Sequence, residues 1–269
     1  MTRLRVHPVK PATARVVPLT VTGSERLSPH VQRVTLSGAG EIAPLGFDQW
    51  FRALVRRPGQ TELHLLKDVG LVSYVRYVTL PETVRPLLRN YTVRELRGDE
   101  LDVDVVVHGE VSPTEASFAS WAVHVKPGDP AAVLDEGRIW NPPADTDSVL
   151  VVSDESGLPA VAGICRDLPR DVRGTVILEL PSAEDAQDLE APDGVTVQLV
   201  VRTDAHARPG VAALAALGAA TLPDGVPYVF AIGEQALATG ARRDVVARGV
   251  PKEHVSFCGY WKYGARASR

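Results

Sequence analysis

The sequence is poor in cysteine, carries little net charge and contains no long hydrophobic run. Its two cysteines, Cys165 and Cys258, lie far apart in apolar segments of a 269-residue chain. We therefore expect buried free thiols rather than a redox pair or a metal site. A formal net charge of -4 gives no reason to expect nucleic acid or an anionic membrane as the main partner. Charged residues interrupt every apolar stretch, so the sequence predicts no membrane span.

Familiar targeting and catalytic motifs are also missing. The basic amino-terminal segment has neither the apolar stretch nor the small-residue cleavage site of a secretory signal, and we expect a cytoplasmic protein. The sequence contains no Gly-x-Ser-x-Gly, P-loop, His-Glu-x-x-His, Cys-x-x-Cys or Gly-x-Gly-x-x-Gly motif. These absences exclude the usual signatures of nucleophilic, phosphate-binding and zinc-dependent catalysis, and no resident metal is predicted.

The first half of the chain has the hydrophobic pattern of short β-strands separated by turns. The β-rich runs cover 15–22, 30–37, 50–57, 88–96, 101–108 and 131–136. In one run, Asp102 and Asp104 alternate with leucine and valine, which predicts one buried face and one partly wet face. Six such runs with local turns are typical of an antiparallel barrel or sandwich.

The second half has a different pattern after the linker-like segment 141–148. Nearly continuous apolar runs alternate with helical patterns, which is typical of a parallel sheet covered on both faces. The runs cover 149–153, 175–180, 195–201, 228–232 and 254–260, and the helical patterns cover 157–168, 211–220 and 234–248. We predict an N-terminal antiparallel β-barrel domain, 1–143, followed by a doubly wound parallel-sheet α/β domain, 144–269. Ligands of such sheets bind outside the carboxyl ends of the strands, here 153–160, 232–235 and 259–264.

The short run "RNYT" places unusual chemistry on one strand. Arg89 and Tyr91 share one face, and Asn90 and Thr92 share the other. A flavin dinucleotide needs a cation for its pyrophosphate, a flat surface for its isoalloxazine ring and a hydrogen-bonding group near N5, which arginine, tyrosine and threonine supply. Taken alone, the run favours an ordinary strand with a packing tyrosine over a flavin site.

Five segments in order resemble one known family. "RNYTVRE", "LDVDVVVHG" with "SWAVHVKPGD", "SDESGLPAVAGI", "FAIGE" and "ARRDVVARGVPKEHVSFCGYWKYG" are similar to motifs of the siderophore-interacting protein family. That family comprises FAD-dependent ferric-siderophore reductases of the ferredoxin reductase superfamily. The resemblance extends over roughly residues 17 to 266.

In the first domain, the resemblance implies a set of FAD contacts. Arg89 would meet the pyrophosphate, Tyr91 would lie against the isoalloxazine, and Thr92 would bond near N5, with Asn90 in the same motif. His108 and the loop after it would approach the cofactor, although a strand-end histidine bonded to backbone is equally compatible with the sequence. Backbone amides around the helix start would meet phosphate oxygens, at Ala119, Ser120 and Trp121.

In the second domain, the resemblance places candidate residues at the carboxyl ends of strands. Asp154, Glu155 and Ser156 follow the first strand, where a nicotinamide or substrate could reach the flavin, and Thr92, Asp154 and Glu155 are the catalytic candidates. Helix capping by Asp154 or Ser156 explains these residues about as well. The remaining candidates are Gly233, Glu234, Tyr260 and Trp261 for cofactor binding, and Lys262 and Arg266 for an anionic chelate or as a solvated tail.

The resemblance implies electron transfer from NAD(P)H through FAD to ferric iron, which would arrive bound to a siderophore. The partner is then a small molecule, with the protein as monomer or homodimer. A preference for NADPH would require a cation at the 2′-phosphate, with Arg202, Arg208, Arg242 and Arg243 as candidates.

Two departures from the family pattern keep other functions open. The segment 109–122 lacks the expected Gly-Pro turn before Trp121, and 61–88, with Tyr74 and Tyr77, is unlike a short connection. The latter could be a lid, a dimer contact or a substrate wall. The alternatives are a tailoring step on an intermediate of specialised metabolite biosynthesis, without ferric reductase activity, and chelate binding without catalysis.

Overall fold

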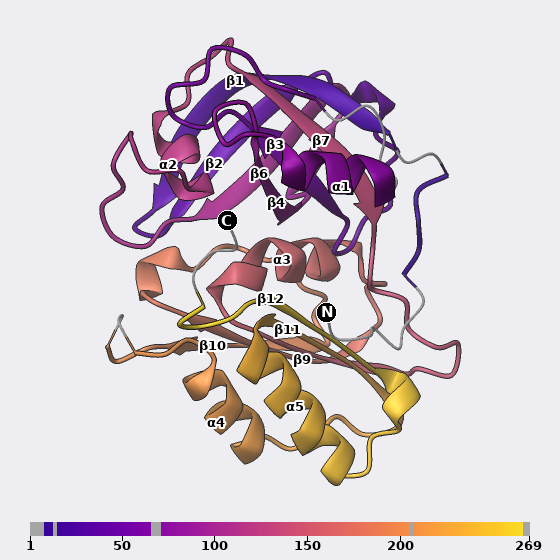
Figure 1. The fold of residues 1–269 in the computed structure, drawn as a ribbon. Coiled ribbons are helices and arrows are strands. Elements are labelled where there is room, and N and C mark those ends of the chain that lie inside the picture. Colours follow the sequence, from indigo (N-terminus) through magenta and orange to yellow (C-terminus); the bar gives the residue numbers. More distant parts are fainter. Residues whose placement is uncertain (1–7, 13–14, 66–70, 205–206, 266–269) are drawn as a thin grey trace. The chain divides into compact units, whose positions relative to one another are not determined.

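The computed structural model describes residues 8–12, 15–65, 71–204 and 207–265 (Figure 1). The chain forms two compact units. The barrel unit consists of Lys10–Leu45 and Gln49–Arg138, and the parallel-sheet unit consists of Met1–Val9, Gly46–Asp48 and Ile139–Arg269. Within the described ranges, no helix is long and apolar enough to cross a membrane.

The barrel unit is built on one seven-stranded antiparallel sheet. Its strands are β1 (Val16–Ser28), β2 (Val31–Ser37), β3 (Trp50–Val55), β4 (Leu87–Thr92), β5 (Glu95–Arg97), β6 (Glu100–Val106) and β7 (Pro130–Gly137), in the order β4-β3-β7-β1-β2-β6-β5. The two edge strands, β4 and β5, are joined by only two residues, and the Arg94 amide donates to the Asp102 carbonyl at 3.0 Å. The sheet must therefore curl until its edges meet, which confirms the predicted antiparallel barrel.

The aspartates of β6 are buried, so the prediction of a partly wet face was wrong. Arg33 forms a bidentate pair with Asp104 at 2.7 and 2.8 Å, and Arg97 donates to Asp102 at 2.6 Å. Both carboxylates are almost inaccessible because the long arginine side chains lie over them. Alternation in the sequence showed that the two aspartates share one face of the strand, but it could not show that arginines of neighbouring strands cover that face.

The unusual segment 61–88 contains the helix α1 (Leu71–Thr79). Tyr77 is buried and donates its hydroxyl to the Pro86 carbonyl at 3.1 Å, so it packs within the barrel unit. Val75 and Val78 are exposed on the same helix. The side chain of Tyr74 lies outside the described part of the chain.

The parallel-sheet unit has the predicted doubly wound architecture. Its strands are β8 (Ser148–Ser153), β9 (Arg173–Leu180), β10 (Val195–Val201), β11 (Pro227–Glu234) and β12 (Val255–Trp261), all parallel in the order β10-β9-β8-β11-β12. The helix α3 (Leu158–Asp167) lies on one face, and α4 (Val211–Ala219) and α5 (Gln235–Ala247) lie on the other (Figure 1). The strand order reverses between β8 and β11, which makes their carboxyl ends the expected ligand-binding edge.

The short segment Gly46–Asp48 folds with the parallel-sheet unit although its neighbours in sequence belong to the barrel unit. The Phe47 ring stacks on Trp140 at 5.8 Å between centroids, and its amide donates to Asp167. The buried Asp48 carboxylate accepts from the Trp140 amide at 2.8 Å. Gly163 is required here, since a Cβ at that position would lie 2.1 Å from the Phe47 carbonyl oxygen.

Both cysteines are free. Cys165 is buried in α3 as expected, whereas Cys258 is partly exposed near the end of β12, so the expectation of burial was wrong for Cys258. Loss of hydration, complete for Cys165 and partial for Cys258, raises the pKa of both thiols to about 11. Neither is therefore activated as a thiolate near neutral pH.

Candidate functional site

The run "RNYT" forms most of β4, at one edge of the barrel sheet. Arg89 and Tyr91 are half-buried on one face, Asn90 is exposed, and Thr92 is buried. Tyr91 lies directly opposite the buried Phe51 of β3, so its ring packs over the barrel core. The structure thus provides a cation and an aromatic ring on one accessible strand face.

An aromatic cluster joins Tyr91 to the helix α2 (Phe118–His124). The Phe118 ring lies 4.5 Å from Tyr91 and 4.9 Å from Trp121, centroid to centroid. Burial raises the pKa of Tyr91, with a smaller lowering effect from Arg89, so the phenol stays neutral. Sequence reasoning did not select Phe118. The sequence pattern that could have identified Phe118 is its position three residues before Trp121 on a predicted helix, which places both rings on one helix face.

The start of α2 is capped by its own chain. The Ser117 hydroxyl accepts from the Ser120 amide at 3.1 Å, and Ser120 donates its own hydroxyl to the Ser112 carbonyl at 2.7 Å. Ala119 is partly exposed. His108, just beyond β6, is exposed, and its ring lies 6.5 Å from that of His30. A phosphate at Ser120 would have to compete with the Ser117 hydroxyl.

In the parallel-sheet unit, Asp154 links the carboxyl ends of β8 and β11. Its carboxylate is fully buried and accepts from the Glu234 amide at 2.6 Å and the Ser156 amide at 2.9 Å. Gly233 allows this approach, because a Cβ there would lie 2.6 Å from the Asp154 carboxylate. Burial, followed by the charge of Glu155, raises the pKa of Asp154 to about 6. Asp154 is also a capping residue, but it caps the short turn Glu155–Gly157 rather than the helix α3 that follows.

Glu155 belongs to a buried ion network. Arg202 pairs with both Glu155 oxygens at 2.8 Å and with Glu179 at 2.9 Å, and all three side chains are at most 3% exposed. Burial lowers the pKa of Arg202, but the hydrogen bonds to both glutamates outweigh it and leave the pKa raised. Contact of Glu155 with a substrate, or of Arg202 with a 2′-phosphate, would require breaking these pairs.

Glu234 anchors the segment that follows β12. Its carboxylate accepts from the Ala236 amide at 2.5 Å at the start of α5, and from the Tyr263 amide at 3.1 Å. Arg208 donates to it at 3.2 Å and lies over the Tyr263 ring at 5.5 Å. Burial raises the pKa of Glu234, but these amides and Arg208 outweigh it, and the pKa is lowered.

Buried charge therefore connects the carboxyl ends of neighbouring strands in the sheet. Glu179 on β9, Arg202 after β10 and Glu155 after β8 form one group, and Asp154 with Glu234 joins β8 to β11 and to the segment after β12. This arrangement holds the predicted ligand-binding edge in one geometry. Such fixed backbone is what a cofactor or substrate site requires.

The remaining candidates lie at the end of β12. Tyr260 is 37% exposed, Trp261 is partly buried with its ring 6.4 Å from that of Tyr263, and Lys262 is exposed. Arg266 lies outside the described residues. Of the other cations, Arg242 lies over the Phe257 ring at 5.2 Å, and Arg243 is exposed.

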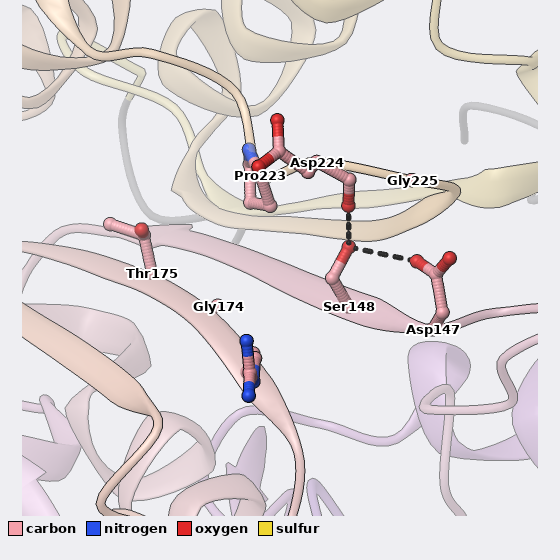
Figure 2. Close-up of a pocket in the computed structure, with 8 residues that line it drawn as sticks. Asp147, Ser148, Gly174, Thr175, Pro223, Asp224 and Gly225 are labelled. Carbon is pink, nitrogen blue, oxygen red and sulfur yellow. Dashed lines mark hydrogen bonds between the residues drawn. The ribbon is translucent and has the colours of Figure 1, made fainter.

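A pocket of about 490 Å³ lies at the opposite end of the strands from Asp154, at the amino ends of β8 and β9 (Figure 2). The Ser148 hydroxyl lies 3.2 Å from the Asp147 carboxylate and 3.0 Å from the Asp224 carbonyl. This pocket is remote along the strands from Asp154 and is not part of the candidate site. Among the described residues, no group of three or more His, Cys, Asp or Glu could hold a metal ion.

Comparison with known proteins gives matches to both halves. A family model described as a siderophore-interacting FAD-binding domain matches residues 20–139, and one described as a siderophore-interacting protein matches residues 146–264. The ferric vibriobactin reductase ViuB of Vibrio cholerae is 28% identical over 187 residues, covering 67% of this chain and 66% of the relative. The NADPH-dependent ferric-chelate reductase of Escherichia coli is 28% identical over 251 residues, covering 90% of this chain and 91% of the relative.

A solved structure extends the match to nearly the whole chain. The siderophore utilization protein from T. fusca is 27% identical, with a TM-score of 0.78 over 98% of this chain and 97% of the other. The two matched family models follow one another along the chain, as the motifs of the barrel and the parallel sheet do. The chain belongs to the siderophore-interacting protein family.

Proposed function

We propose that this protein is a flavin-dependent reductase that transfers electrons from NAD(P)H to ferric iron held in a siderophore. The observation that carries the proposal is the half-buried Tyr91 beside Arg89 on β4, within a segment that matches a siderophore-interacting FAD-binding domain. Two relatives support it by name, one as a ferric vibriobactin reductase and one as an NADPH-dependent ferric-chelate reductase.

The residues of the barrel unit fit FAD in chemistry. Tyr91 would offer a neutral aromatic surface for the isoalloxazine, and Arg89 a partly exposed guanidinium for the pyrophosphate. Thr92 is buried and lies on the other face by strand alternation, so its proposed bond near N5 would require the chain to turn at the end of β4. We assign the larger share of pyrophosphate binding to Arg89 because its guanidinium is charged and has several donors, one of which donates to the Leu88 carbonyl at 2.8 Å, whereas Ser120 offers a single amide that donates to Ser117. Asn90, His108 and the backbone at Ala119 and Trp121 complete the proposed FAD contacts.

The parallel-sheet unit would bind the nicotinamide cosubstrate at the carboxyl ends of its strands. When bound, FAD would supply the redox chemistry, namely two-electron acceptance of hydride from NAD(P)H and one-electron donation to each of two ferric ions. The backbone held by Asp154 and Glu234 shapes this edge, while Ser156, Gly233, Tyr260 and Trp261 are proposed contacts. Exposed Lys262, together with Arg266, would attract an anionic ferric chelate.

The decisive test is the absorption spectrum of the purified protein, before and after anaerobic addition of NADPH or NADH. We expect flavin bands that bleach on addition and return when a ferric siderophore is supplied, with two ferric ions reduced per NAD(P)H. A colourless protein that cannot be reconstituted with FAD would contradict the proposal. A flavoprotein that oxidises NAD(P)H but does not reduce ferric chelates would favour the biosynthetic alternative.

Substitution of Arg89 tests the pyrophosphate contact. Arg89→Ala is expected to weaken FAD binding by about 2 kcal/mol, because a charge-assisted hydrogen bond to phosphate is lost. The measurement is the FAD dissociation constant of the apoprotein by fluorescence titration. Arg26→Ala is the control, since Arg26 is exposed on β1 and donates locally to the Pro29 carbonyl. Equal FAD affinity in the Arg89→Ala variant and the native chain would refute this assignment.

A further inference from the structure

Tyr91 is supported from within the barrel unit by one particular side chain. Phe118 is only 5% exposed, and its ring lies 4.5 Å from the Tyr91 ring with 35° between the ring planes. Trp121 contacts Phe118 at 4.9 Å and 59°. The three rings form a continuous cluster from β4 to α2, at separations typical of favourable aromatic pairs.

The backbone that carries Phe118 is itself fixed. Phe118 is the first residue of α2, directly after the N-cap Ser117, whose side chain accepts from the Ser120 amide. Ser120 in turn donates to the Ser112 carbonyl, which ties the preceding loop to the helix. Tyr91 has less support from its own strand, because β4 is an edge strand that pairs only with β3.

We propose that Phe118 is a positioning residue that holds the Tyr91 ring in the orientation that receives the flavin. The inference rests on the proposed function and adds a specific residue to it. A ring that is already oriented loses little freedom when a ligand stacks on it, so preorganisation raises affinity without any direct contact. Phe118 is buried on the core side of Tyr91, where it would act on the flavin through Tyr91 rather than by touching it.

The test is a double-mutant cycle on FAD affinity, measured by fluorescence titration of the apoprotein. Phe118→Leu is expected to weaken FAD binding about three- to tenfold in the native background, the range expected for one aromatic pair. In the Tyr91→Leu background, the same change is expected to have less than a twofold effect, because the residue through which Phe118 acts is gone. Phe118→Met, which preserves apolar volume, is the second replacement in case the leucine variant folds poorly.

Leu101→Ala serves as the control for general loosening of the core. Leu101 is fully buried on β6 in the same hydrophobic cluster, so its truncation should lower stability while leaving FAD affinity within twofold. Equal losses from Phe118→Leu in both backgrounds, or no loss in the native background, would overturn the inference while the proposed function stands. Failure of the native chain to bind FAD would overturn both.

Discussion

Replacing Arg202 with methionine is expected to lower the free energy of unfolding by about 3–5 kcal/mol. The guanidinium is buried between Glu155 and Glu179, so its removal leaves carboxylates in the interior without their positive partner. Breaking a buried ion pair from one side has a large cost, because the remaining charge was removed from water and is no longer compensated. Chemical denaturation of the apoprotein at neutral pH measures the change.

Arg202 bonds to both glutamates, through two oxygens of Glu155 and one of Glu179. Glu179 also accepts from the Gly210 amide at 2.9 Å and the Ala213 amide at 2.7 Å, at the start of α4, whereas both oxygens of Glu155 are engaged by Arg202. A second substitution, Glu155→Met, removes one of the two buried carboxylates and should therefore recover part of the stability lost in Arg202→Met. Such a recovery would show that Arg202→Met destabilises the fold by leaving a buried carboxylate uncompensated, since a loss of packing alone would not be recovered by removing a second side chain.

The matched control is an ion pair at the surface. Arg15 and Glu41 lie 2.9 Å apart with both side chains exposed, and Arg15→Met should change stability by less than about 1 kcal/mol. If Arg202→Met falls within that same range, the buried network does not stabilise the fold as the geometry indicates.

The sequence predicted the elements well because their signals are local. Near-continuous apolar runs identified all five parallel strands, and alternation of core and surface residues placed most barrel strand ends to within about two residues. The exception is β1, which continues to Ser28 although the predicted run ended at 22. The run 88–96 was read as one strand but forms β4 and β5, because two residues between them turn the chain from one sheet edge to the other. Within "RNYT", period-two alternation predicted correctly that Arg89 and Tyr91 share a face.

What the sequence could not predict depends on contacts between distant segments. Arg202 was a candidate for a cosubstrate phosphate on charge alone, but the structure turns it inward onto glutamates 23 and 47 positions away. Phe118 was overlooked because its contact with Tyr91, which lies on another element, forms only in the folded chain. The roles of the candidate site residues remain predictions that the proposed experiments test.

Asp154→Asn is expected to remove a pH dependence from the stability of the protein. The folded-state pKa of Asp154 is raised from 3.8 to about 6, mainly by burial and secondarily by Glu155. Because the pKa is higher in the folded state, protonated Asp154 stabilises the fold at low pH, and this contribution is lost as the pH rises from about 4 through about 6. The full difference corresponds to about 3 kcal/mol at 1.36 kcal/mol per unit of pKa.

The measurement is the difference in unfolding free energy between the native chain and Asp154→Asn at several pH values. The asparagine side chain cannot accept from both the Glu234 and Ser156 amides through two oxygens as the carboxylate does, so the variant has a different unfolding free energy at every pH. This part of the difference does not depend on pH. The native chain should lose about 2 kcal/mol relative to the variant between pH 4.5 and 7.5. Exposed Asp171, changed to asparagine in the same unit, should show no comparable trend. A difference that stays constant with pH would mean that Asp154 is not the buried, titrating link between β8 and β11.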